Sequence, residues 1–137
     1  MKHYTSIEQS EKLLELGLSP ETADMFYNEE PDETYRKDIV DTKYPMIIRE
    51  GQKHYLEEYG IPCWSFGALF DLMPKIKEFY YPSLYKCSFD VTACMYSTQE
   101  HDIFKIYTGK DSLEAAFNMV VWLLENNYIN KINNGKA

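Results

Sequence analysis

Cys63 is the residue that most resembles a catalytic group. It lies in the stretch IPCWSFGALF (61–70), and a cysteine followed by Trp64 at the start of an apolar helix is typical of papain-like proteases. Their histidine lies about 130 residues downstream of the nucleophile, but only 74 residues follow Cys63 here. A different hydrolase, in which His54 or His101 activates Cys63, is an alternative. We expect instead a buried thiol beside a core tryptophan.

A zinc site is the second kind of chemistry to weigh. Cys87, Cys94 and His101 recur every seven residues, and Cys63 could complete a set of four ligands. Structural zinc sites normally use pairs of ligands two to four residues apart, and an odd spacing along one strand would place Cys87 and Cys94 on opposite faces. The sequence therefore predicts no metal site, and no motif in it indicates a cofactor.

Nucleic-acid binding is the third possibility. Residues 13–23, LLELGLSPETA, resemble the turn of a helix-turn-helix regulator. No basic residue lies between Lys12 and Arg36, whereas a recognition helix needs basic or amide side chains. We therefore expect no direct binding to nucleic acid.

The charge of the chain is concentrated in one segment. The formal net charge is −8, and residues 8–41 hold eleven acidic against three basic residues. Such a segment repels phosphate backbones and acidic membranes. The favoured interpretation is a solvated acidic face, and the alternative is a mimic of nucleic acid that occupies the basic groove of another protein.

Length and composition indicate one domain over residues 1–137. With 45% hydrophobic residues the chain can build a single core, and twelve of its aromatic residues are tyrosines. It contains no apolar run of membrane-spanning length, and its N-terminus lacks the apolar core of a signal peptide. Three cysteines without a CxxC pair indicate reduced thiols. We expect a cytoplasmic protein.

Four helices and a small sheet are predicted to position these residues. Apolar periodicity predicts helices over 6–16, 19–27, 64–73 and 112–127, the first capped by Thr5 and ended by Gly17, and the last capped by Asp111. We also expect a long loop or an irregular strand pair over 28–45, a short strand over 45–49, a helical turn over 52–59 and a frayed tail over 130–137.

Residues 85–95 alternate between apolar and polar side chains, which indicates a half-buried strand or two strands around a turn near Asp90. Residues 102–107 follow as an antiparallel partner. The predicted fold class is α+β, with a small antiparallel sheet of two to four strands over about 84–107. The helices over 64–73 and 112–127 pack on one face of it, and an N-terminal helical pair lies alongside.

Three blocks of the sequence together resemble a known family. They are YTSIEQSEKLLELGLSPETADMFY (4–27), IPCWSFGALFDLMP (61–74) and DSLEAAFNMVVWLLENNYI (111–129). They are similar to small uncharacterised proteins common in gut bacteria of the Bacteroides group, which are often encoded among prophage and mobile-element genes. The resemblance implies an accessory protein of phage or mobile-element origin, and it implies no activity and no site residues.

The sequence contains no complete catalytic set. We therefore expect a non-enzymatic protein-interaction or regulatory module that binds a protein partner or forms a homo-oligomer. Its candidate partner surface is the aromatic run Phe79, Tyr80 and Tyr81. The alternatives are the hydrolase that uses Cys63 and the nucleic-acid mimic that uses residues 8–41.

Overall fold

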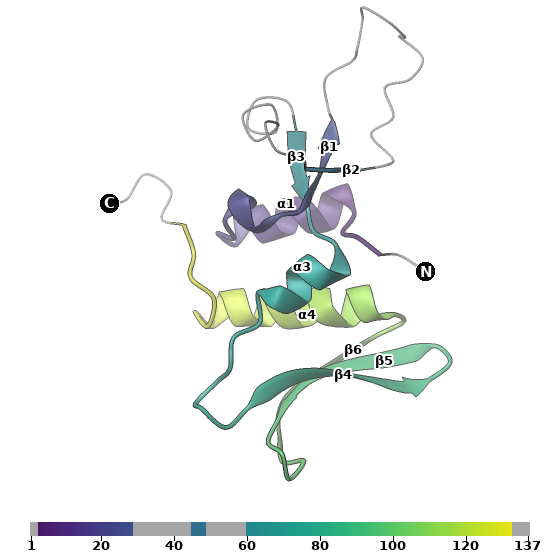
Figure 1. Cartoon of the computed structure of the whole chain (residues 1–137), viewed down its shortest axis with the longest axis vertical. Helices are drawn as coiled ribbons and strands as arrows, with labels where there is room; N and C mark the ends of the chain where they lie inside the picture. Colours follow the sequence, from purple (N-terminus) through teal and green to yellow (C-terminus); the bar gives the residue numbers. More distant parts are fainter. Residues whose placement is uncertain (1–2, 29–44, 49–59, 133–137) are drawn as a thin grey trace, which may run out of the picture.

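The computed structural model describes residues 3–28, 45–48 and 60–132 of the chain (Figure 1). Within these residues there are three α-helices and two antiparallel sheets of three strands each. The predicted α+β class is therefore confirmed. The helical turn expected over 52–59 and most of the loop expected over 28–45 lie outside the described residues.

The first helix, α1 (Ile7–Glu15), begins one residue later than its sequence predicts. Ser6, not Thr5, is the N-cap: its side chain accepts a hydrogen bond from the Gln9 backbone N–H, and the Gln9 side chain accepts one from the Ser6 N–H. Thr5 cannot serve as the cap because its hydroxyl already bonds to other buried groups. The predicted cap at Thr5 is therefore wrong, and the capping box joins Ser6 and Gln9.

Gly17 ends α1 as predicted. It has a φ of 97°, a conformation that costs little only for glycine. Its N–H donates to Leu14 O, and the N–H of Leu18 donates to Leu13 O, both at 3.0 Å, which is the pattern of a Schellman cap. Leu13 and Leu18 are both fully buried, so the turn brings the chain back onto the core.

The second predicted helix, over 19–27, is wrong beyond its first turn. Ser19 and Pro20 do start a helical turn, but it is a single 3₁₀ turn, η1 (Pro20–Thr22). The chain then becomes strand β1 (Met25–Asn28). The starting signals are local, whereas the pairing of β1 with strands distant in the sequence decides the rest of the segment.

β1 is the central strand of the smaller sheet. It pairs antiparallel with β2 (Met46–Ile47) and with β3 (Gly60–Cys63). The strand predicted over 45–49 is thus confirmed in its middle. Pro62 belongs to β3 and lies opposite Phe26 in the register.

The helix predicted over 64–73 is α3 (Phe66–Asp71), which is shorter at both ends. Ser65 is its N-cap and accepts a hydrogen bond from the Ala68 N–H at 3.2 Å. Ser65 also donates its backbone N–H and its hydroxyl to the Asp24 carboxylate. These bonds attach the start of α3 to the start of β1.

The larger sheet has the strand order β4-β5-β6, formed by β4 (Tyr81–Ser88), β5 (Val91–Ser97) and β6 (Ile103–Gly109). The predicted turn near Asp90 separates β4 from β5, and the expected antiparallel partner over 102–107 is β6. The antiparallel pairing of these strands is therefore confirmed, although β4 begins at Tyr81, before the expected start near residue 84.

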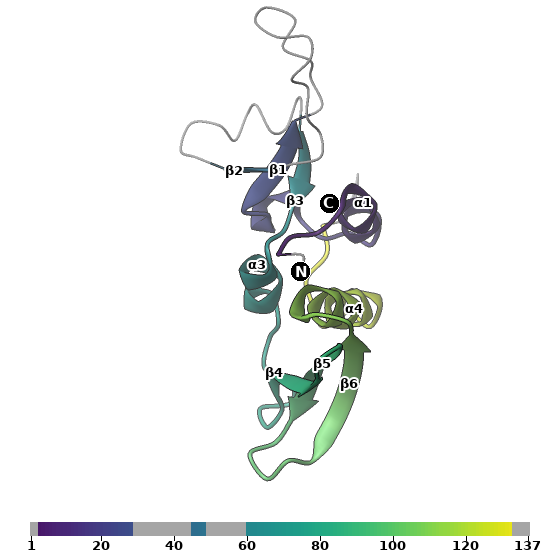
Figure 2. The same ribbon diagram turned by 90° about the vertical axis from the view of Figure 1, so that its right-hand side faces the viewer.

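The last helix, α4 (Ser112–Glu125), is capped by Asp111, which accepts a hydrogen bond from the Glu114 N–H at 2.9 Å. α4 lies against one face of the larger sheet, with α3 beside it (Figure 1). Figure 2 shows that α1 and the smaller sheet lie on the far side of these two helices. The elements thus follow one another along the long axis of the molecule, with the larger sheet at one end.

The core fills the space between the larger sheet, α3, α4 and α1. Trp64 is fully buried in it, as expected. Its indole N–H donates to the Thr22 hydroxyl at 2.9 Å, so its polar group is satisfied. Other fully buried members of this core come from the sheet and from all three helices: Leu13, Leu69, Cys94, Tyr96, Ala116, Met119, Val120, Leu123 and Leu124.

Candidate functional site

Cys63, the strongest catalytic candidate in the sequence, lies in a closed hydrogen-bond network at the end of β3. Its thiol is fully buried and donates to Thr5 O at 3.3 Å. The Thr5 hydroxyl accepts from the Trp64 N–H at 3.0 Å and shares a 2.7 Å hydrogen bond with Ser10. The Tyr27 hydroxyl donates to the same Thr5 carbonyl at 2.7 Å. Every group in this network has a structural partner.

The electrostatics around Cys63 oppose a nucleophilic role. Burial raises the pKa of the Cys63 thiol to about 11, more than the hydrogen bonds from Thr5 and Tyr27 lower it, and the charge of Asp24 raises it further. A thiol with this pKa is protonated at neutral pH and is a poor nucleophile. His101 is exposed in the β5–β6 turn, and His54 lies outside the described residues.

The sequence candidates for a metal site are not brought together. Cys87 is exposed on β4, whereas Cys94 is buried on β5 with its thiol 3.7 Å from the Met73 sulfur. In the described part of the chain, no group of three His, Cys, Asp or Glu residues is arranged to hold a metal ion.

The acidic segment 8–41 is described only as far as residue 28. In that part the acidic side chains Glu8, Glu11, Glu15, Glu21 and Asp24 are all exposed. They lie on α1, on η1 and before β1, and the rest of the segment lies outside the described residues. The helix-turn-helix resemblance ends here too, because the segment after the turn is η1 and β1 instead of a recognition helix.

The aromatic run at 79–81 is divided between two surroundings. Tyr80 is half-buried, and its ring centroid lies 4.9 Å from that of Phe104 next to the core. Phe79 is 67% exposed and Tyr81 is 45% exposed. The structure thus places Phe79 and Tyr81 at the surface and Tyr80 against the core.

Tyr81 belongs to a larger surface that we call the outer face, which is the side of the β4-β5-β6 sheet opposite α4. The register assigns nine residues to it in three rows across the strands. They are Tyr81, Ser97 and Ile103; Ser83, Met95 and Ile106; and Tyr85, Ala93 and Thr108. The neighbouring row with Leu84, Cys94 and Tyr107 faces α4 and contributes to the core. In the described part of the chain the helices lie on that side of the sheet alone (Figures 1 and 2).

The composition of the outer face is unusual for a surface in contact with water. None of its nine residues is charged, although 26% of the chain is. Tyr85 is 61% exposed, Ile103 54% and Ile106 43%. One-sided antiparallel sheets normally present polar residues to solvent, and an extended exposed apolar patch marks an interaction site.

The strands β4 and β5 are half-buried, as the alternation over 85–95 predicts. Of the apolar side chains in the alternation over 85–95, Tyr85, Phe89 and Val91 are exposed, whereas Ala93 is fully buried. Cys94 and Tyr96 are also fully buried, and they face the helices. Half-burial was predicted, and the buried side was not.

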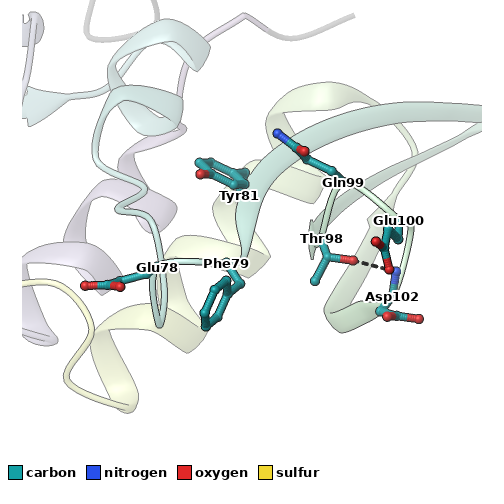
Figure 3. Close-up of a pocket in the computed structure, with 7 residues that line it drawn as sticks. All are labelled: Glu78, Phe79, Tyr81, Thr98, Gln99, Glu100 and Asp102. Atoms are coloured by element: carbon teal, nitrogen blue, oxygen red, sulfur yellow. Dashed lines mark hydrogen bonds between the residues drawn. The ribbon is translucent and has the colours of Figure 1, made fainter.

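A pocket adjoins the outer face where β4 begins and β5 ends (Figure 3). It has a volume of about 360 Å³, and its lining combines two aromatic rings, three carboxylates and two neutral polar side chains: Phe79, Tyr81, Glu78, Glu100, Asp102, Thr98 and Gln99. The backbone is strained around it, because Lys77, Glu78 and His101 all have positive φ values. Of these residues the sequence singled out only Phe79 and Tyr81, and it gave no signal for those that follow β5.

Comparisons with known proteins give no further guidance: no family model, curated protein or solved structure matches the chain. Among the described residues, no helix has the length and apolar composition needed to cross a bilayer.

Proposed function

We propose that the protein is a non-enzymatic interaction module that binds another protein through the outer face of the β4-β5-β6 sheet. The single observation that carries this proposal is that an open sheet face of nine residues contains no charge and exposes large apolar side chains. The resemblance of its three sequence blocks supports a role as a cytoplasmic accessory protein of phage or mobile-element origin.

The energetics favour a covered outer face. Fully burying a side chain of the size of tyrosine or isoleucine contributes about 1.5–3 kcal/mol. Tyr81, Tyr85, Ile103 and Ile106 are each about half exposed, so each has roughly 1 kcal/mol left to gain. Together these four side chains would contribute about 4 kcal/mol, which offsets part of the cost of association.

The two buried thiols support the proposal because they are unsuited to catalysis. In the described part of the chain, Cys63 and Cys94 are fully buried and their pKa values are raised by burial, to about 11 and about 12. Neither thiol reaches the surface where a substrate could bind. The outer face is therefore a better candidate for the functional site than these two buried thiols.

The experiment is a comparison of partners recovered by two tagged variants from the cells that naturally encode the protein. In the first variant, Tyr85→Lys and Ile106→Lys place two charges on the outer face. In the matched control, Ile47→Lys changes a 67% exposed apolar residue on the smaller sheet. Circular dichroism checks that both variants fold.

We expect the outer-face variant to lose the partners that the unchanged protein retains, by at least tenfold in recovered amount, because each charge would be desolvated in the interface. The control should retain them. Equal recovery by both variants would refute the proposal, as would a strict monomer that recovers no partner.

A further inference from the structure

The outer face continues into a groove beside its row of Tyr81, Ser97 and Ile103. A shallow groove of about 260 Å³ runs over Tyr81, Ser83, Ser97, Thr98 and Gln99. It shares Tyr81, Thr98 and Gln99 with the pocket of Figure 3. A segment lying along the outer face would therefore pass directly over the mouth of the pocket.

The chemistry of the pocket differs from that of the outer face. Figure 3 shows Phe79 and Tyr81 on one side of it and Thr98, Glu100 and Asp102 on the other, with the Glu78 carboxylate directed away from them. The uncharged groove thus leads to a space bounded by aromatic rings and carboxylates. Aromatic faces attract cations, and carboxylates form strong hydrogen bonds with guanidinium groups.

The acidic lining has no cation of its own. In the part of the chain that the structure describes, no ion pair involves Glu78, Glu100 or Asp102, and no lysine, arginine or histidine lines the pocket. Two lysines shortly before Glu78 in the sequence lie over aromatic rings instead: Lys75 Nζ lies 5.8 Å from the Tyr81 ring centroid, and Lys77 Nζ lies 5.0 Å from that of Phe104. A cation that complements these acidic residues would therefore come from the partner.

We propose that the partner segment on the outer face carries an arginine whose side chain enters this pocket, flanked by apolar residues that cover the sheet. This inference rests on the proposed function, and it specifies the chemistry of the partner. Arginine fits better than lysine, because its planar guanidinium stacks on aromatic rings and binds carboxylates with two hydrogen bonds at once. Its apolar stem packs against Phe79 or Tyr81 while its charged end meets Glu100 and Asp102.

The test uses two synthetic peptides that differ in one atom group. The first is acetyl-Val-Ile-Arg-Ile-Val-amide, and the second carries citrulline, the uncharged isostere of arginine, at its centre. Each is titrated into the full-length protein while backbone amide chemical shifts are followed by NMR. We expect the arginine peptide to shift the amides of Thr98, Gln99 and Asp102, and to bind about tenfold more tightly than the citrulline peptide, since charge removal weakens such hydrogen bonds by that factor.

Charge-neutralising variants test the same contact from the protein side. Glu100→Gln with Asp102→Asn should bring the arginine peptide down to the affinity of the citrulline peptide and leave the citrulline peptide unaffected. Glu125→Gln, which removes an exposed carboxylate at the end of α4, should change neither affinity. The described hydrogen bonds of Asp102 use its backbone, so its variant should fold.

The outcomes separate this inference from the proposed function. Equal binding of both peptides on the outer face overturns the arginine site and leaves an apolar interaction surface. Absence of any shift at about 10 mM peptide, a concentration at which even millimolar affinity would be visible, also overturns it. A concentration-dependent dimer that protects the outer face from hydrogen exchange would assign this face to a second copy of the chain and would likewise overturn the arginine site.

Discussion

Two tyrosines of this protein provide a matched test of how it is stabilised, because removing the same atom from each should have opposite effects. Tyr96 and Tyr27 are both buried, at 0% and 3% exposure, and burial raises the pKa of both hydroxyls. Among the described residues the Tyr96 hydroxyl has no hydrogen-bond partner. The Tyr27 hydroxyl donates to Thr5 O at 2.7 Å.

The expected changes in unfolding free energy follow from these contacts. An unsatisfied buried hydroxyl costs about 1–3 kcal/mol, and Tyr96→Phe removes that cost while leaving a small gap, so we expect a gain of about 1 kcal/mol. Tyr27→Phe removes a satisfied hydrogen bond, which costs about 1 kcal/mol. The loss is not larger because Thr5 O keeps its hydrogen bond from the Cys63 thiol at 3.3 Å. The two variants should thus differ by about 2 kcal/mol in unfolding free energy.

Guanidinium chloride unfolding, monitored by tryptophan fluorescence at neutral pH, measures both values. The slope of the transition should be unchanged, because neither substitution alters the surface exposed on unfolding. In thermal unfolding, the two variants should shift the midpoint by roughly 3–5 °C in opposite directions. A loss of 1 kcal/mol or more in Tyr96→Phe would show that its hydroxyl is hydrogen-bonded in the folded protein and would refute the reasoning.

Three further predictions concern stability. Gly109→Ala should lower the unfolding free energy by about 2 kcal/mol in chemical unfolding, since a Cβ there would lie 2.6 Å from a backbone nitrogen of α4. Gly67→Ala, whose Cβ would have its nearest contact at 3.8 Å, should raise the unfolding free energy by about 0.5 kcal/mol. Equal effects of the two substitutions would contradict the packing described. Asp111→Ala should cost about 1 kcal/mol through loss of the α4 cap, seen as a lower thermal midpoint, and an unchanged midpoint would count against that cap. Burial raises the pKa of Cys63 to about 11 and of Cys94 to about 12. The unfolded chain then releases its thiol protons first, so the contribution of these two thiols to stability is constant below about pH 8.5 and falls above it. A rise of the unfolding free energy between pH 9 and 10.5 would contradict this assignment.

Much of the fold could be predicted because its signals are local. The capped start of α4 at Asp111, the glycine turn at Gly17 and the strand alternation around Asp90 depend on neighbouring residues, and the structure contains all three. The segment 19–27 could not be predicted, since the helical turn that Pro20 starts gives way to β1. Its pairing with β2 and β3 is a contact between distant parts of the chain.

The candidate surface could be predicted only in part from the sequence. Phe79 and Tyr81 were singled out by their type alone, and they lie at its edge. The outer face itself was missed because a period of two shows that a strand has two different sides, but not which side the helices cover. Cys94 and Tyr96 contact the helical core, but Tyr85 and Met95 on the opposite side are also largely apolar, so residue type alone does not separate the two sides.

The most direct test of the central claim, that the outer face is the interaction surface, is site-specific photo-crosslinking in the cells that naturally encode the protein. A photoreactive benzoylphenylalanine replaces Ile106 in one variant and Ile47 in another, both exposed apolar positions. We predict a discrete crosslinked protein, larger than a single chain, from position 106 and none from position 47. Crosslinks that are absent at position 106, or equally strong at both positions, would contradict the account.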